Sequence, residues 1–174
     1  MNVTLEQLIK IMPQASASQR RLFVQPLNDA MVEFEINNEK RVEAFLAQIA
    51  WESGQLRYVH ELASGKAYEG RADLGNVHPG DGVKYKGRAL IEITGLANYI
   101  AVMMALGIDC VEHPELLEEP ENACRASAWF WKSHGLNELA DVGNFEKITR
   151  VINGGLNGEK QRLALWEITK EVIA

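Results

Sequence analysis

Basic residues, cysteines and long apolar runs are scarce in this sequence. Its 174 residues carry 18 basic and 24 acidic side chains, a net charge of −6. Without a basic surface to neutralise phosphates, we expect no nucleic-acid partner, and this charge gives no attraction to an anionic membrane or cell wall. No stretch approaches the roughly 20 apolar residues of a membrane span, so we expect no membrane insertion.

Only two cysteines are present, Cys110 and Cys124, without a CxxC motif or a Cys/His cluster. The glycines match neither a P-loop nor a dinucleotide fingerprint. We therefore expect no metal and no cofactor. The cysteines are predicted to be core thiols, able to pair only in an oxidising compartment.

The first seven residues have neither a basic n-region nor an apolar h-region. We therefore expect synthesis in the cytoplasm without a signal peptide, with any export by another route. With 47% hydrophobic residues, the chain fits a single domain over residues 1–174 with a sizeable core.

Helical patterns dominate, so we predict a mainly α fold. Thr4-x-x-Gln7 predicts a capping box for a first helix that Pro13 ends, and Pro26 fits the first position of a second helix. Asn37 or Asn38 would cap a third. Later helices are predicted over residues 98–106, 123–131 (capped by Asn122), 145–152 and 159–173, with a short helical turn at 114–117. The last helix is predicted to pack through Leu163, Trp166 and Ile173.

The third predicted helix carries an acid on its apolar stripe. Phe45, Ile49 and Glu52 follow the i, i+4, i+7 spacing, and Gly54 suits the position after the helix end. Burial and the negative end of the helix dipole would both disfavour the anion of Glu52, as a general acid requires. The alternative is an ordinary glutamate at a helix end, pointing to solvent.

Residues 54–87 lack periodicity and hold seven of the fourteen glycines. So long an irregular segment is uncommon unless it is functional, and its side chains suit a binding wall. A mobile surface loop is the alternative. The polar and aromatic residues concerned are Tyr58, His60, Glu61, Tyr68, Arg71, Asp73, His78 and Tyr85.

An extended segment is predicted over residues 86–95, with Leu90, Glu92 and Thr94 on one face. These groups would converge on a ligand or form the wet side of an edge strand. Residues 153–158, NGGLNG, would let backbone and Asn side chains approach a ligand, although a tight turn explains the same glycines.

Two carboxylates beside aromatic, Asn and hydroxyl groups are the minimum for glycoside hydrolysis. Ser53 has no nucleophile elbow around it, since WESG is not G-x-S-x-G. The chemistry best matched by the residues is therefore that of an acid pair.

Several motifs, in order, resemble glycoside hydrolase family 19, and more closely its bacterial and prophage chitinase-like branch, which contains endolysins. The resemblance covers nearly the whole chain from Leu5 onward. The motifs are FLAQIAWESG (45–54), YEGRADLGN (68–76), PGDG (79–82), YKGRALIEITGLANY (85–99), PELLEEPENA (114–123), AWFW…HGLN (128–137) and INGGLNG (152–158).

This resemblance implies a bilobal, lysozyme-like α-helical fold with the long glycine-rich loop and a sugar cleft between the lobes. It also implies an inverting mechanism on β-1,4-linked N-acetylated amino sugars, in which the carboxyls stand roughly 6.5–9.5 Å apart. Glu52 matches the general acid, Glu61 the general base, and Thr94 the hydroxyl that holds the attacking water. The matching substrate-binding positions are Tyr58, Tyr85, Lys86, Arg88, Glu92, Asn98 and Asn153.

Three positions depart from the family pattern. Trp51 stands where His usually precedes the acid, and Leu96 where the endolysin branch often has Arg. Glu92 replaces the usual Gln and adds a third acid, whose like charge disfavours ionisation of its neighbours.

Three functions follow as expectations. The first is a prophage-type endolysin, a monomer that cleaves the peptidoglycan backbone in the periplasm after a separate pore-forming protein releases it. The second is a chitinase. The third is a non-catalytic glycan-binding relative.

Overall fold

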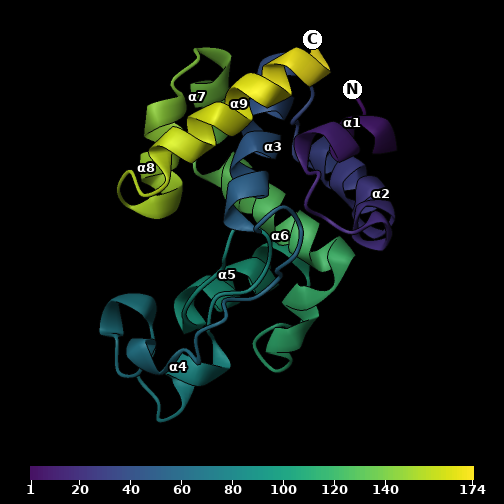
Figure 1. Cartoon of the computed structure of the whole chain (residues 1–174). Helices are drawn as coiled ribbons and strands as arrows, with labels where there is room; N and C mark the ends of the chain where they lie inside the picture. Colours follow the sequence, from purple (N-terminus) through teal and green to yellow (C-terminus); the bar gives the residue numbers. More distant parts are fainter.

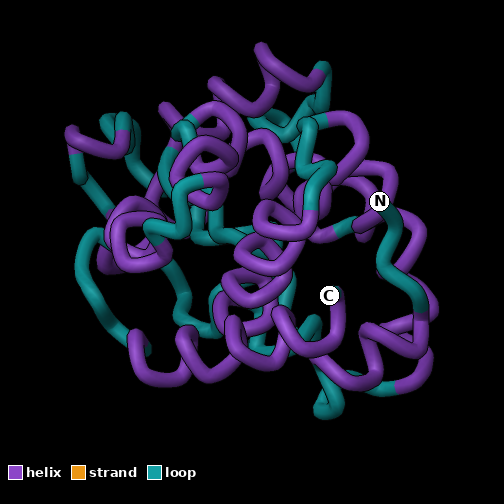
Figure 2. Tube along the Cα trace, turned by 90° about the horizontal axis from the view of Figure 1, so that it is seen from above, coloured by secondary structure: helices purple, strands orange, loops and turns teal.

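The computed structural model describes all 174 residues and contains helices, turns and loops but no strand (Figure 2). The prediction of a mainly α fold is confirmed. The helices are α1 (Leu5–Ile11), α2 (Ala17–Glu33), α3 (Glu39–Glu52), α4 (Asp81–Lys84), α5 (Leu96–Leu106), α6 (Pro120–Ser133), α7 (Leu136–Asp141), α8 (Phe145–Asn153) and α9 (Glu159–Ile173). Three 3-10 turns are η1 (Lys66–Tyr68), η2 (Ala72–Leu74) and η3 (Pro114–Glu118).

The larger lobe is built around α3. This helix is buried on every side from Val42 to Ala50, and it packs against α9, while α2 packs against α6 (Figure 1). The rings of Phe45 and Trp131 meet edge to face at 5.3 Å between centroids. A helix buried all round holds its last residue rigidly, because every side chain before it is packed.

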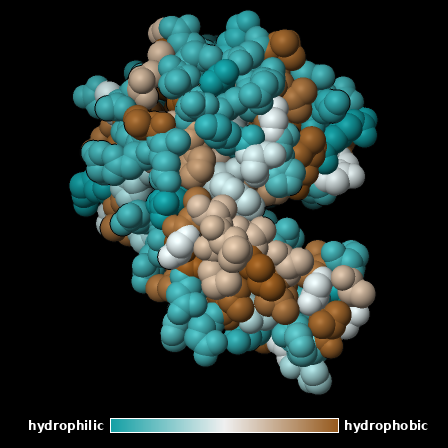
Figure 3. All heavy atoms as spheres, turned by 180° about the vertical axis from the view of Figure 1, so that it is seen from behind, coloured by the Kyte–Doolittle hydropathy of each residue, from teal (hydrophilic) through white to brown (hydrophobic).

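The smaller lobe contains η1, η2, α4 and α5; in Figure 1, α4 lies at the lower end of the molecule and α5 lies above it, next to α6. Its irregular backbone is joined by isolated bridges, His60 to Arg88 and Arg88 to Ile93. Figure 3 shows a hollow between the two lobes at one edge of the molecule.

The predicted extended segment over residues 86–95 is wrong. Ala89 has a φ of +79°, and the hydroxyl of Ser127 on α6 accepts hydrogen bonds from the backbone N–H of Leu90 and of Ile91. This turn buries Leu90 and leaves Glu92 exposed, so the two do not share a face. A tertiary contact to α6 replaces the alternation expected of a strand.

Two predicted helix starts are also wrong. Pro26 lies inside α2, which begins earlier at a capping box formed by Ser16 and Gln19. The residue whose carbonyl loses its partner, Leu22, is exposed, so water can satisfy that oxygen. Pro120 begins α6, and Asn122 instead donates to the carbonyl of Leu116. Helix α7 was not predicted.

Other local predictions are confirmed. Thr4 and Gln7 form the capping box of α1, and Asn38 caps α3. Gly107 ends α5 in a left-handed conformation. The predicted bounds of the last helix, 159–173, match those of α9.

Cys110 and Cys124 are free and buried, as core thiols should be. None of the helices has both the length and the apolar content that crossing a membrane requires.

Candidate active site

Glu52 is the last residue of α3, as predicted, and Gly54 follows in a left-handed conformation with a φ of +57°. Its Oε1 atom is buried and lies 2.5 Å from Nη2 of Arg162 on α9, as an ion pair without a directed hydrogen bond. The guanidinium of Arg162 therefore lies directly against the carboxyl group of Glu52.

Arg162 is itself fixed by a buried network. It is 1% exposed, its Nη1 donates to Oε1 of Gln48 at 2.6 Å, and its Nε donates to the carbonyl of Asn157 at 2.9 Å. Gln48 in turn donates to the hydroxyl of Thr149 at 2.9 Å. The cation that faces Glu52 is therefore held on every side by the larger lobe.

Arg162 was not among the predicted site residues. Leu163 was predicted to lie on the packed face of the last helix, but Leu163 is 38% exposed, and this part of the prediction is wrong. The residues that are buried are Arg162, Thr169 and Ile173. Their i, i+7, i+11 spacing places the three residues on one face of the helix and could have indicated its buried side. An arginine at such a position, however, is ordinarily expected to face solvent.

A tight reversal leads the chain from Glu52 toward the smaller lobe. Gly54, Gln55 and Leu56 have successive φ values of +57°, +60° and +64°. The buried hydroxyl of Ser53 donates to the carbonyl of Ile49 at 2.6 Å and accepts from the N–H of Leu56 at 2.8 Å. Two non-glycine residues in this conformation are strained, so Ser53 stabilises a costly turn beside the acid.

Glu61 lies beyond this reversal, in the smaller lobe. Its Oε1 accepts from the backbone N–H of Gly87 at 2.7 Å, and its Oε2 from the hydroxyl of Tyr68 at 3.1 Å. The N–H of Glu61 donates to the carbonyl of Gly87 at 2.9 Å. Burial, followed by the charges of Glu61 and Glu92, raises the pKa of Tyr68, so this hydroxyl stays a hydrogen-bond donor.

Glu92 lies over the same Gly87. A Cβ at that glycine would meet Oε2 of Glu92 at 2.6 Å, so a side chain there would push the Glu92 carboxylate aside. The Glu92 side chain is reached by solvent but surrounded by protein atoms. This partial burial, followed by repulsion from Glu61 and Glu52, raises its pKa to about 7. Glu92, the third acid predicted from the departure from the family pattern, therefore lies beside Glu61.

Five other predicted site residues have at least partly accessible surfaces. Tyr58 is 41% exposed beside Gly54, and Thr94 and Lys86 are half-buried. Asn98 is exposed, and it donates to the carbonyl of Thr94 at 2.7 Å. Asn153, the last residue of α8, is also exposed, and its Oδ1 accepts from the N–H of Asn157. Their roles toward a substrate stay predictions.

Tyr85 and Arg88 do not fit the predicted cleft wall. Tyr85 is 4% exposed, its ring lies tilted against that of Tyr99, and its hydroxyl donates to the carbonyl of Val111. Arg88 pairs with Glu118 and also donates to the hydroxyl of Tyr99. The hydroxyl of Tyr85 and the Nε and Nη1 atoms of Arg88 thus already bond to protein atoms.

Trp51, the unusual neighbour of the acid, packs on the start of α9. A Cβ at Gly158 would lie 2.5 Å from its ring carbons, and the guanidinium carbon of Arg162 is 5.9 Å from the ring centroid. The indole therefore fills the space beside the Arg162–Glu52 pair.

Known proteins are similar to this chain in part of its sequence. A glycosyl hydrolase family 19 domain-containing protein from Haemophilus influenzae is 41% identical over 106 residues, 61% of this chain and 51% of that protein. An endochitinase from Arabidopsis thaliana is 35% identical over 70% of this chain and 42% of its own length. The chain is a relative of glycosyl hydrolase family 19.

Solved structures of family 19 relatives share the fold. Chitinase C from Streptomyces griseus superposes with a TM-score of 0.79 at 22% identity, over 98% of this chain and 76% of that one. A bacterial family 19 chitinase gives a TM-score of 0.78 at 22% identity, over 99% and 95% of the two chains. No family model matches the chain. The chain spans about half the length of the curated relatives it matches.

Proposed function

We propose that this protein is an inverting glycoside hydrolase acting on β-1,4-linked N-acetylated amino sugars. The observation that carries the proposal is the arrangement of Glu52 and Glu61. Arg162 of the larger lobe holds one acid, Gly87 and Tyr68 of the smaller lobe hold the other, and Glu92 is repelled by both.

In the proposed reaction, protonated Glu52 gives its proton to the glycosidic oxygen as the bond to the anomeric carbon breaks. Glu61 takes a proton from a water molecule, whose oxygen bonds to that carbon from the opposite face. Glu52 ends as a carboxylate and Glu61 as a carboxylic acid. Arg162 stabilises the charge that develops on Glu52 as its proton leaves. Thr94 is proposed to orient the water.

The proposed substrate is the peptidoglycan backbone, as for an endolysin. The motifs shared with the endolysin branch support this choice. The protein would act as a monomer in the periplasm, after a separate pore-forming protein has released it from the cytoplasm. The second candidate is chitin, because several of the matched relatives are named endochitinases.

Purified Gram-negative peptidoglycan and a soluble N-acetylglucosamine oligomer would be incubated with wild type, Glu52→Gln and Glu61→Gln. We expect wild type to cleave peptidoglycan and both variants to lose at least a hundredfold in rate. Cleavage of the oligomer alone would favour the chitinase, and cleavage of neither would leave a glycan-binding relative. Mass analysis of the products would identify the sugar at the new reducing end.

A further inference from the structure

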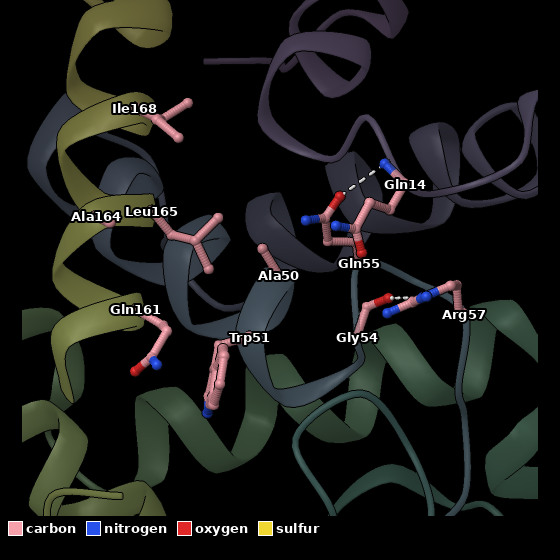
Figure 4. Close-up of a pocket in the computed structure, with 10 residues that line it drawn as sticks. All are labelled: Gln14, Ala50, Trp51, Gly54, Gln55, Arg57, Gln161, Ala164, Leu165 and Ile168. Atoms are coloured by element: carbon pink, nitrogen blue, oxygen red, sulfur yellow. Dashed lines mark hydrogen bonds between the residues drawn. The ribbon is translucent and has the colours of Figure 1, made fainter. Parts of the chain in front are cut away.

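A separate pocket lies next to the active site, on the larger lobe. It has a volume of about 480 Å³, within the range of small-ligand sites. Glu52, Glu61 and Glu92 do not line it. Its walls come from α3, α9, the reversal after Glu52 and the connection between α1 and α2 (Figure 4). The lining residues are Gln14, Ala50, Trp51, Gly54, Gln55, Arg57, Gln161, Ala164, Leu165 and Ile168.

The lining combines apolar groups, uncharged polar groups and one cation, Arg57. Two hydrogen bonds that involve a side chain join lining residues: the N–H of Gln14 donates to Oε1 of Gln55, and Nε of Arg57 donates to the carbonyl of Gly54. The amide of Gln161 and the outer nitrogens of Arg57 thus bond to no other lining residue. They are free to meet a ligand with hydroxyl, amide or carboxylate groups.

None of the lining residues is acidic, although the chain has 24 acidic side chains. This absence, with the single cation of Arg57 at the lining, favours a neutral or anionic ligand. Trp51 offers an aromatic face, and Leu165 and Ile168 offer an apolar wall. Ile168 is 39% exposed, so this wall is open to solvent.

We propose that the pocket is a non-catalytic binding site for an N-acetylated amino sugar. The sugar ring lies against the Trp51 indole, amide side chains bond its hydroxyl and acetamido groups, and the acetyl methyl contacts Leu165 and Ile168. The choice of a glycan rests on the proposed function. Because Trp51 directly precedes Glu52, the pocket would hold a neighbouring part of the polymer that the active site cuts.

The chain has four tryptophans, so their indole N–H signals are few enough to assign by NMR. A soluble β-1,4-linked N-acetylglucosamine tetramer would be titrated into Glu61→Gln, which leaves the ligand uncut. We expect the Trp51 signal to shift. A second titration with a muramic-acid-containing disaccharide tests whether a carboxylate strengthens binding through Arg57, which Arg57→Gln would reverse.

Ala164→Phe narrows the pocket from an exposed position on α9, and Leu163→Phe is the matched control one residue away, outside the lining. Ala164→Phe should weaken binding read at Trp51 about tenfold, equivalent to 1.4 kcal/mol, and leave turnover of the soluble tetramer within about twofold. Gln161→Ala, which removes only the amide, should weaken it about threefold. Leu163→Phe should change neither.

A Trp51 signal that does not shift on titration would overturn the proposed site. A Trp51 shift of the same size with and without Ala164→Phe would also overturn it, since the sugar would then reach Trp51 from the active-site cleft. If wild type cleaves the tetramer but the Trp51 signal does not shift, the pocket proposal alone fails and the proposed hydrolase activity stands. If Ala164→Phe abolishes the Trp51 shift but wild type cleaves no glycan, the proposed hydrolase activity alone fails and the pocket proposal stands.

Discussion

Arg162 of α9 and Glu52 of α3 form a buried ion pair, with 2.5 Å between Nη2 and Oε1. Removing the arginine would leave the acid and the Gln48 amide without their partner. We expect Arg162→Met to destabilise the protein by about 3 kcal/mol, because a buried charge loses its counter-charge. The rate should fall as well, since the charge that develops on Glu52 is no longer stabilised.

The matched control for Arg162→Met is Arg150→Met. Arg150 pairs with Glu146 at 2.9 Å, but both side chains are more than half exposed, so its loss should cost less than about 1 kcal/mol. Urea unfolding and initial rates measure both effects. Equal stability of the two variants would contradict the structural role given to Arg162.

Ser53→Ala tests the strained reversal after Glu52. The substitution removes a buried hydroxyl that joins Ile49 to Leu56. It should cost about 1–3 kcal/mol, because the N–H of Leu56 loses its partner. It should also lower kcat more than it changes KM, since Glu52 and Glu61 flank this turn.

Ser133→Ala serves as the control, because the Ser133 hydroxyl is exposed and bonds only locally. Thermal unfolding and steady-state kinetics on the cleaved substrate would compare the two variants. Ser53→Thr keeps the hydroxyl and should recover part of the rate. If Ser53→Ala keeps wild-type kcat, the reversal does not set the geometry of the acids.

Glu92 makes stability depend on pH. Its folded-state pKa of about 7 lies above the ordinary value of 4.5, so between these pH values the folded protein keeps a proton that the unfolded chain loses. This contribution to stability is complete below about pH 4.5 and is lost as the pH rises through 7. Glu92→Gln should therefore raise Tm at pH 8 and change it little at pH 4.5.

The control for Glu92→Gln is Glu171→Gln, an exposed acid on α9 whose substitution should shift Tm equally at both pH values. Calorimetry at pH 4.5 and pH 8 gives the comparison. A Glu92→Gln effect that is the same at both pH values would contradict the raised pKa of Glu92.

The two cysteines should be inert in the folded protein. Both thiols are buried, and burial raises the pKa of Cys110 to about 11 and that of Cys124 further. A thiol reagent at pH 8 should label neither cysteine until the protein unfolds in guanidinium, where two thiols should react. Rapid labelling of one thiol in the native state would contradict this, and quantitative labelling with and without denaturant measures it.

Local signals explain which features the sequence predicted. The position of Glu52 followed from the spacing after Phe45 and from Gly54, both within one turn or two of the acid. The bounds of α9 followed from glycine before it and helical spacing within it. Such features depend on neighbours in the chain, which the sequence displays directly.

Features set by distant contacts were missed. The burial of Arg162 depends on Gln48 and Thr149, and that of Tyr85 on Tyr99 and the carbonyl of Val111. A single sequence does not show which polar atoms will meet. By position alone, the family resemblance predicted that Tyr85 and Arg88 line the cleft wall. In this chain, local packing buries Tyr85 and half-buries Arg88.

The Arg162–Glu52 pair also determines when, during synthesis of the chain, the acid site can form. Both acids leave the ribosome before Arg162, the cation that holds Glu52, which is added 110 residues after Glu52. A nascent chain that ends before α9 holds Glu52 and Glu61 yet lacks the group that fixes the first of them. The complete acid site therefore forms only once the helix that carries Arg162 has been made and has docked on α3.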